Sequence, residues 1–105
     1  MKRRPPETER SEQNLAFLAS ALSSLRGAGE VLAFLEDLCT PAELEAMSDR
    51  WRVVPLLQEG VPYREIHDRT QVSVTTIGRV ARTLERGTGG YGIAAGRLGQ
   101  PDAPE

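Results

Sequence analysis

The sequence predicts an all-α protein, and three features of the chain support this fold class. From residue 15 onward, apolar residues recur three and four positions apart, which is the spacing of one face of an α-helix. Residues 40–43 have the composition that typically begins a helix. A short helix, a tight turn and a longer helix are expected between Tyr63 and about Arg86, and this order is that of a helix-turn-helix.

The length of the chain and the composition of its ends predict one folded domain between two tails. The 105 residues suit a single domain. Residues 1–10 and 87–105 are rich in proline, glycine and charge, so we expect a disordered N-terminal tail and a mobile C-terminal tail. Residues 11–86 then form the domain. Because so short a segment supports only a thin core, we expect it to form a homodimer.

Composition also indicates the compartment. No apolar run approaches the roughly 20 residues that cross a bilayer. The basic start of the chain is followed by Pro5 and Pro6, where a signal peptide would have an apolar stretch. Cys39 is the sole cysteine, so it can form no internal disulfide and cannot hold a metal alone. We therefore expect a cytoplasmic protein with neither metal nor cofactor.

Two helices are expected before residue 40. The first is marked by leucines at helical spacing, and Gly27 and Gly29 end it. These leucines are Leu15, Leu18, Leu22 and Leu25. The second helix runs from about Glu30 to Leu38 and is apolar around most of its circumference, so we expect it to be covered on several sides, in part by a partner chain.

A longer helix is expected to begin at Thr40. The Thr40 hydroxyl can accept a hydrogen bond from the Glu43 amide while the Glu43 carboxylate reaches back to the Thr40 amide, and Pro41 suits the first helical position. The apolar stripe continues in phase to Gly60, so we expect one helix bent near Pro55 rather than two helices. The stripe consists of Leu44, Met47, Trp51, Val54 and Leu57.

Pro62 opens the first helix of the predicted motif, and this helix presents Ile66 to the core and ends near Thr70. Gln71 stands in the turn, where positive φ costs a residue other than glycine about 1 kcal/mol. Ser73 is the expected N-cap of the second helix. The inner face of that helix is predicted to consist of Val74, Ile77, Val80, Ala81 and Leu84.

Charge is distributed unevenly along the chain, although the formal net charge is only −2. Residues 11–60 carry eight acids against three arginines, whereas residues 61–86 carry five arginines against three acids. An acidic body beside a basic helix-turn-helix is typical of a DNA-binding protein, of which one face meets phosphate. Scattered surface charge on an ordinary helical hairpin is the alternative interpretation.

The stretch from Leu38 to Tyr91 resembles the tryptophan-repressor superfamily, and within it the Trp-repressor-like branch called YerC/YecD. Three features carry the resemblance: the helix opening Thr40-Pro41-x-Glu43, the spacing of the helix-turn-helix, and the segment 87–91, Gly-Thr-Gly-Gly-Tyr. The resemblance implies a Trp-repressor-like helical bundle that forms an intertwined homodimer. It also implies that the start of the second motif helix enters the major groove of double-stranded DNA.

Residues that contact DNA follow from the resemblance and from charge. Positions corresponding to the repressor's DNA contacts are Arg64, Val74, Thr75, Thr76 and Gly78. Arg79 and Arg82 lie further along the second motif helix, where we expect them to meet phosphates without reading sequence. His67 stands where the two helices approach each other closely, and we interpret it as a partly exposed spacer rather than a proton switch or a metal ligand.

The corepressor site of the resembled family transfers less well. Thr40, Arg50 and Arg79 correspond to its ligand-binding residues. However, Val80 stands where a glycine leaves room for the indole ring, and Asp37 stands where an apolar residue of the other subunit covers it. Both changes oppose binding. We therefore do not expect tryptophan to act as corepressor; Arg50 and Arg79 are candidates for another small ligand, or for ion pairs and phosphate.

These features predict a sequence-specific transcriptional regulator, a repressor, that acts through a helix-turn-helix in the major groove. The alternative is a helical dimer that serves as a protein-interaction module or as an accessory to the transcription machinery. An enzyme is not expected. One histidine without a placed nucleophile makes no catalytic triad, and the glycines after residue 86 have neither the spacing nor the lysine of a phosphate-binding loop.

Overall fold

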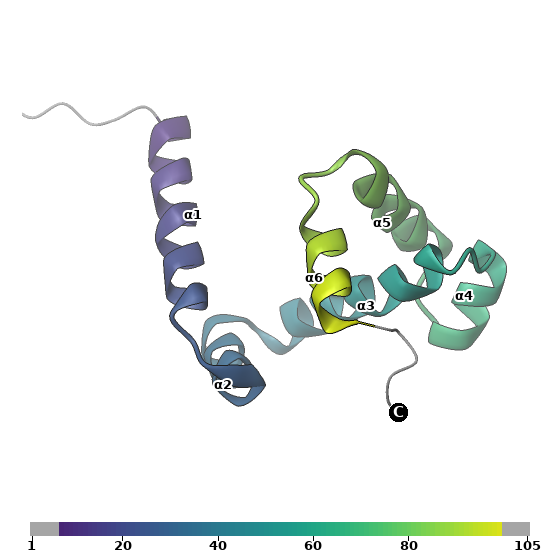
Figure 1. Cartoon of the computed structure of the whole chain (residues 1–105), viewed down its shortest axis with the longest axis horizontal. Coiled ribbons are helices and arrows are strands. Elements are labelled where there is room, and N and C mark those ends of the chain that lie inside the picture. Colours follow the sequence, from purple (N-terminus) through teal and green to yellow (C-terminus); the bar gives the residue numbers. More distant parts are fainter. Residues whose placement is uncertain (1–6, 100–105) are drawn as a thin grey trace, which may run out of the picture. The chain divides into compact units, whose positions relative to one another are not determined.

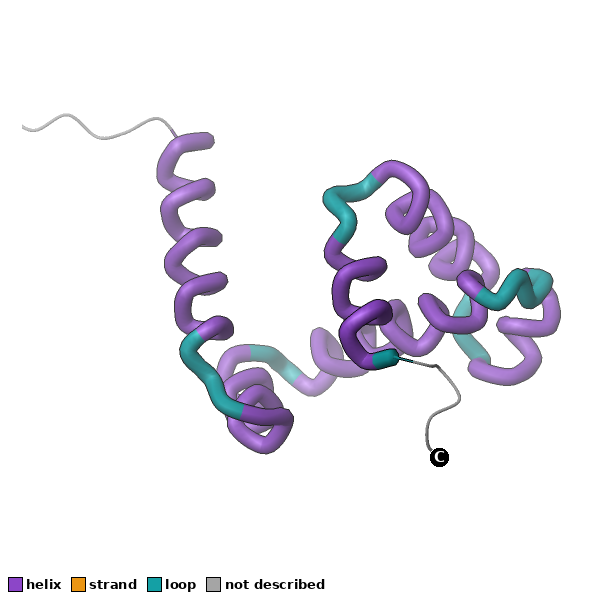
Figure 2. Tube along the Cα trace, in the orientation of Figure 1, coloured by secondary structure: helices purple, strands orange, loops and turns teal. Residues whose placement is uncertain are grey.

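The structure, a computed structural model, describes residues 7–99 and is helical throughout its regular elements (Figures 1 and 2), as the sequence predicts. The helices within this range are α1 (Glu7–Ser23), α2 (Gly27–Leu38), α3 (Pro41–Gln58), α4 (Tyr63–Thr70), α5 (Val74–Arg86) and α6 (Gly90–Leu98). None of them is both long and apolar enough to cross a membrane. The chain divides after Thr40 into two compact units, which we call the N-terminal unit (residues 7–40) and the C-terminal unit (residues 41–99).

The N-terminal unit consists of α1 and α2. Helix α1 begins at Glu7, so residues 7–10 are helical and correct the expectation of a disordered tail over 1–10; residues 1–6 lie outside the described range. Helix α2 begins at Gly27, three residues earlier than expected, and Glu30 Oε1 accepts a hydrogen bond of 2.8 Å from the Arg26 amide. No residue of either helix is buried.

The C-terminal unit contains the core. Helix α3 packs against α4, α5 and α6, and α4 packs against α5. The core side chains come from α3, α4, α5 and the turn between the last two, and they are Val53, Val54, Ile66, Val72, Ile77 and Val80. Helix α3 continues through Pro55 as a single helix, as expected from its unbroken apolar stripe.

The predicted core of this unit is partly confirmed. Val54, Ile66, Ile77 and Val80 are buried as expected, each with at most 1% of its surface exposed. Val74 is an error in the prediction, because it is 51% exposed rather than on the inner face of α5. The first residue of a helix has no preceding turn beside it, so the periodic pattern is least reliable there.

Helix α6 lies where the sequence predicted a mobile tail, and it corrects that expectation for residues 90–98. Gly89 adopts φ 91°, a left-handed conformation that glycine tolerates, and a new helix then begins. The ring of Tyr91 packs against Trp51 of α3, with 6.2 Å between ring centroids and 42° between ring planes. This contact attaches the glycine-rich segment to the core; residues 100–105 of the expected tail lie outside the described range.

Candidate nucleic-acid interface

The turn between α4 and α5 has the left-handed residue that the sequence predicted. Gln71 adopts φ 67° and ψ 9°, and among residues 7–99 it is the one residue other than glycine with positive φ. Its amide donates a hydrogen bond of 2.7 Å to the His67 carbonyl, and its Nε2 donates one of 3.2 Å to the Asp68 carbonyl. The conformation ends α4 within one residue, which allows α5 to begin after Ser73.

The angle between α4 and α5 is held by hydrogen bonds around the buried Val72. Thr70 Oγ1 donates to the Ile66 carbonyl at 2.7 Å and accepts from the Val72 amide at 3.1 Å. His67 Nδ1 lies 2.8 Å from the Val72 carbonyl oxygen. His67 is half-buried, which agrees with its interpretation as a spacer, and the hydrogen bond adds a positional role to it. Thr70 was not singled out from the sequence, because its contribution depends on this turn geometry.

Helix α5 begins at a capped and exposed end. Ser73 Oγ accepts a hydrogen bond of 3.1 Å from the Thr76 amide and donates one of 3.0 Å to Thr76 Oγ1, which confirms Ser73 as the N-cap. Val74 and Thr75 are exposed, and Thr76 is half-buried. The cap therefore fixes the first turn of α5 while its foremost side chains face solvent.

The basic side chains of this region are exposed. Arg64 on α4 and Arg79, Arg82 and Arg86 on α5 make no ion pair with any residue of the described range 7–99. Arg69 differs, because its Nη2 lies 2.6 Å from Glu65 Oε2. Four arginines thus leave their charge available to an external anion, and three of them lie on α5.

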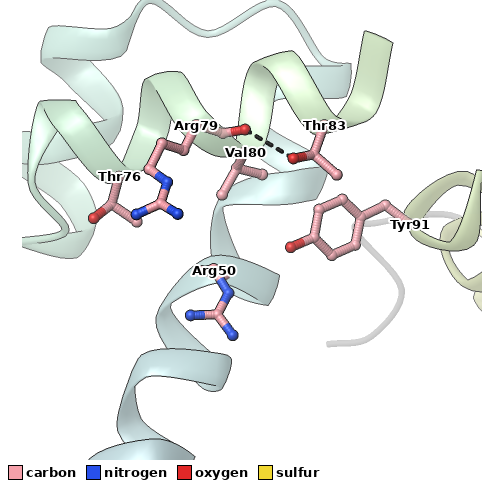
Figure 3. A pocket seen from close by; sticks show the side chains of 6 residues that line it. All are labelled: Arg50, Thr76, Arg79, Val80, Thr83 and Tyr91. Atoms are coloured by element: carbon pink, nitrogen blue, oxygen red, sulfur yellow. Dashed lines mark hydrogen bonds between the residues drawn. The ribbon is translucent and has the colours of Figure 1, made fainter. Parts of the chain in front are cut away.

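A cavity of about 230 Å³ lies beside α5 and brings together two of the predicted ligand residues (Figure 3). Arg50 lines it from α3 and Arg79 from α5, and the Tyr91 hydroxyl points toward the space between them. The complete lining is Arg50, Thr76, Arg79, Val80, Thr83 and Tyr91. Thr40, the third predicted ligand residue, is exposed at the end of the N-terminal unit and is not among the lining residues.

Two lining residues bear on what this cavity can bind. Val80 presents its side chain to the cavity, at the position where the resemblance implied a steric obstacle to an indole ring. Thr83 Oγ1 donates its hydrogen to the Arg79 carbonyl at 3.0 Å. The sequence does not predict Tyr91 as a lining residue, because the composition of its segment is that of a tail. The aromatic residue within that glycine-rich stretch was the signal that could have indicated a docked helix.

A second hollow, of about 250 Å³, continues the basic surface along α5. It shares Arg79 and Thr83 with the first cavity and is otherwise lined by Arg82, Arg86 and Gly87. Within residues 7–99, no three side chains of His, Cys, Asp or Glu lie together as a metal site would require. The chemistry offered by this face is therefore that of guanidinium groups and hydroxyls, which suits phosphates and base edges.

Comparison with known proteins identifies relatives over most of the chain. Residues 13–98 match the family model described as Trp repressor protein. A protein of Bacillus subtilis (strain 168), described as uncharacterized protein YerC, is 35% identical over 86 residues, which cover 82% of this chain and 83% of that protein.

Two solved structures agree with these matches. A TrpR-like protein from Eubacterium eligens has a TM-score of 0.77 and 38% identity, with 83% of this chain and 90% of the other covered. A candidate Trp repressor from Staphylococcus aureus has a TM-score of 0.76 and 31% identity, with coverages of 82% and 86%. Both likenesses support the helical fold described above.

Proposed function

This chain belongs to the Trp repressor protein family, and from that premise and the exposed, capped start of α5 we propose that it is a sequence-specific DNA-binding transcriptional regulator. It binds duplex DNA as a homodimer and acts as a repressor. The observation that carries the proposal is the combination, on α4 and α5, of exposed small side chains at the start of α5 with four arginines unpaired within residues 7–99.

The first turn of α5 is suited to reading bases. In a helix-turn-helix, the N-terminal residues of the second helix contact base edges in the major groove. Val74 and Thr75 are exposed there, and the Ser73 cap holds that turn in place. Thr75 can exchange hydrogen bonds with base edges, and Val74 offers methyl groups for apolar contact.

The arginines have different roles in this proposal. Arg64, at the second residue of α4, reads a base, because a guanidinium pairs bidentately with guanine O6 and N7. Arg79 and Arg82 lie in the middle of α5 and contact phosphates, which adds affinity but no sequence preference. Thr76 and Gly78 complete the proposed DNA-contacting set.

The homodimer is supported by the N-terminal unit. Its helices carry large apolar side chains that are more than half exposed in a single chain, among them Leu15, Phe17 and Leu32. Such surface is unfavourable in water unless it is covered. A second copy covers it in this proposal, and the two copies place two α5 helices on successive major grooves.

The test is duplex selection followed by binding isotherms of three variants at several salt concentrations. Arg64→Ala is expected to lose about 1–3 kcal/mol and to relax the preference at one base position. Arg82→Ala is expected to weaken selected and scrambled duplexes equally and to reduce the slope of log K against log salt by about 1. Arg97→Ala, on α6, removes the same charge from outside the motif and serves as the matched control.

Two results would contradict the proposal. If selection from random duplexes enriched no sequence, specific DNA recognition would be excluded. If Arg64→Ala and Arg82→Ala bound both duplexes as the parent does, the basic face would not meet DNA, and a protein-interaction module would take its place.

A further inference from the structure

Gly78 is an unfavourable residue for its position. It is the fifth residue of the 13-residue helix α5, well inside the helix. Glycine in a helix interior is destabilising relative to alanine, because it loses more backbone entropy on folding and contributes no side chain. A glycine at such a position requires a reason, which can lie in the chain itself or in something that the chain meets.

The chain itself does not require this glycine. A Cβ atom built at Gly78 would lie 3.9 Å from Arg82 Nη1 and 4.0 Å from Tyr63 Cε2, both of which are ordinary van der Waals distances. At Gly87, in contrast, a Cβ atom would lie 2.6 Å from the Thr83 carbonyl oxygen. The backbone of Gly78 is also helical, so no positive φ calls for glycine there.

Gly78 lies on the part of α5 that carries the proposed DNA contacts. Residues three and four positions apart share a helix face, so Gly78 is a neighbour of Val74, Thr75 and Arg82. It also lines a hollow of about 330 Å³, together with the side chains of Tyr63 and Arg82. Gly78 itself is half-buried, and the hollow is completed by Leu57, Ala81, Leu84 and Glu85, so the missing side chain leaves a depression beside the proposed DNA contacts.

We propose that Gly78 is a positioning residue for DNA. Because Gly78 has no side chain, the backbone of α5 can approach the base edges more closely than it could with any other residue at this position. Val74, Thr75 and Arg82 then reach the groove from around this point of closest approach. The inference rests on the proposed function and adds to it the feature that sets the depth of α5 in the major groove. Close approach of a backbone is a common use of glycine.

The experiment compares Gly78→Ala with Gly96→Ala in the full chain. Gly96 lies inside α6, and nothing lies within 4 Å of a Cβ atom built there, so its replacement is a matched control. Gly78→Ala is expected to raise Tm by about 3–8 °C, the range that a gain in helix propensity gives in a small domain. It is expected to weaken binding to the selected duplex roughly 5- to 100-fold, because the added methyl group would overpack the contact between α5 and the base edges. Gly96→Ala should raise Tm and leave the duplex affinity unchanged.

The opposite signs of the two effects distinguish this role from a structural one. A fall in Tm for Gly78→Ala would overturn the inference, since the glycine would then serve the fold. If the parent binds the selected duplex specifically and Gly78→Ala binds it with the same affinity, the inference is overturned while the proposed function stands. Loss of affinity together with a fall to the mass of one chain in sedimentation would overturn it as well, because the close approach would be to a second copy.

Discussion

The N-terminal and C-terminal units have similar apolar patterns but differ completely in burial. In the C-terminal unit, the side chains of Val53, Val54, Ile66, Ile77 and Val80 are fully buried. In the N-terminal unit, α1 and α2 contain no buried residue, and Phe17 is 80% exposed. The comparison shows that a periodic apolar pattern predicts a helix with one apolar face, but it does not identify what covers that face.

The largest effect is expected in the C-terminal core. Ile66→Ala should lower the free energy of unfolding by about 2–5 kcal/mol, because it opens a cavity among side chains that cannot fill it. Ile93→Ala, at a position that is 56% exposed on α6, should change it by no more than about 0.5 kcal/mol. Urea denaturation followed by circular dichroism measures both. Equal losses would mean that the core of this unit does not lie where the structure places it.

The next effect tests what covers α1. We expect sedimentation equilibrium to give twice the mass of one chain, and we expect Leu15→Asp to lower it. Leu15 is 66% exposed in one chain, so an isolated chain would tolerate the aspartate, whereas an apolar interface would have to bury its charge. Ser20→Asp, on another face of α1, adds the same charge and should keep the parent mass.

A parent chain that sediments as a monomer would exclude the homodimer, because α1 and α2 would then remain uncovered in solution. The same conclusion would follow if Leu15→Asp and Ser20→Asp behaved alike. A melting temperature that rises with protein concentration in the parent, and not in Leu15→Asp, would show that the association of two chains through α1 stabilises the fold.

A smaller and opposite effect is expected in the turn. Gln71→Gly should raise the free energy of unfolding by roughly 0.5–1 kcal/mol, because glycine adopts φ 67° without strain. The exposed hydrogen bond from Gln71 Nε2 to Asp68 is lost, which offsets part of the gain. Gln58→Gly, at the last residue of α3, is the control and should lower stability. If both substitutions were destabilising, strain at Gln71 would not be the relevant feature.

The smallest effect is expected from L-tryptophan, which should leave Tm unchanged. Val80 presents its side chain to the cavity between Arg50 and Arg79, and Asp37 lies at the position that the resemblance implies for a covering residue. A ligand held by the native state stabilises it, so thermal denaturation at increasing tryptophan concentration measures binding. A rise in Tm that depends on concentration would show that neither residue obstructs the site.

The sequence determined the local features of this fold. The end of α4 at Thr70, the left-handed Gln71 and the Ser73 cap agree with prediction. Each of these depends on groups within about four residues of one another, such as the amide that a cap residue accepts from. For that reason, the sequence predicts the α4–turn–α5 segment correctly, whereas the candidate DNA-contacting residues rest on the family resemblance and on charge.

Tertiary structure alone decided which faces are covered and which distant residues meet. Val53 and Val72 are buried, although neither belongs to the predicted apolar faces. Val74 is exposed, although the periodic pattern placed it on the inner face of α5. Tyr91 packs on Trp51, forty positions earlier, and so turns a glycine-rich segment into α6 beside the cavity. Burial depends on the surface that a remote helix presents, and a local pattern contains no information about that surface.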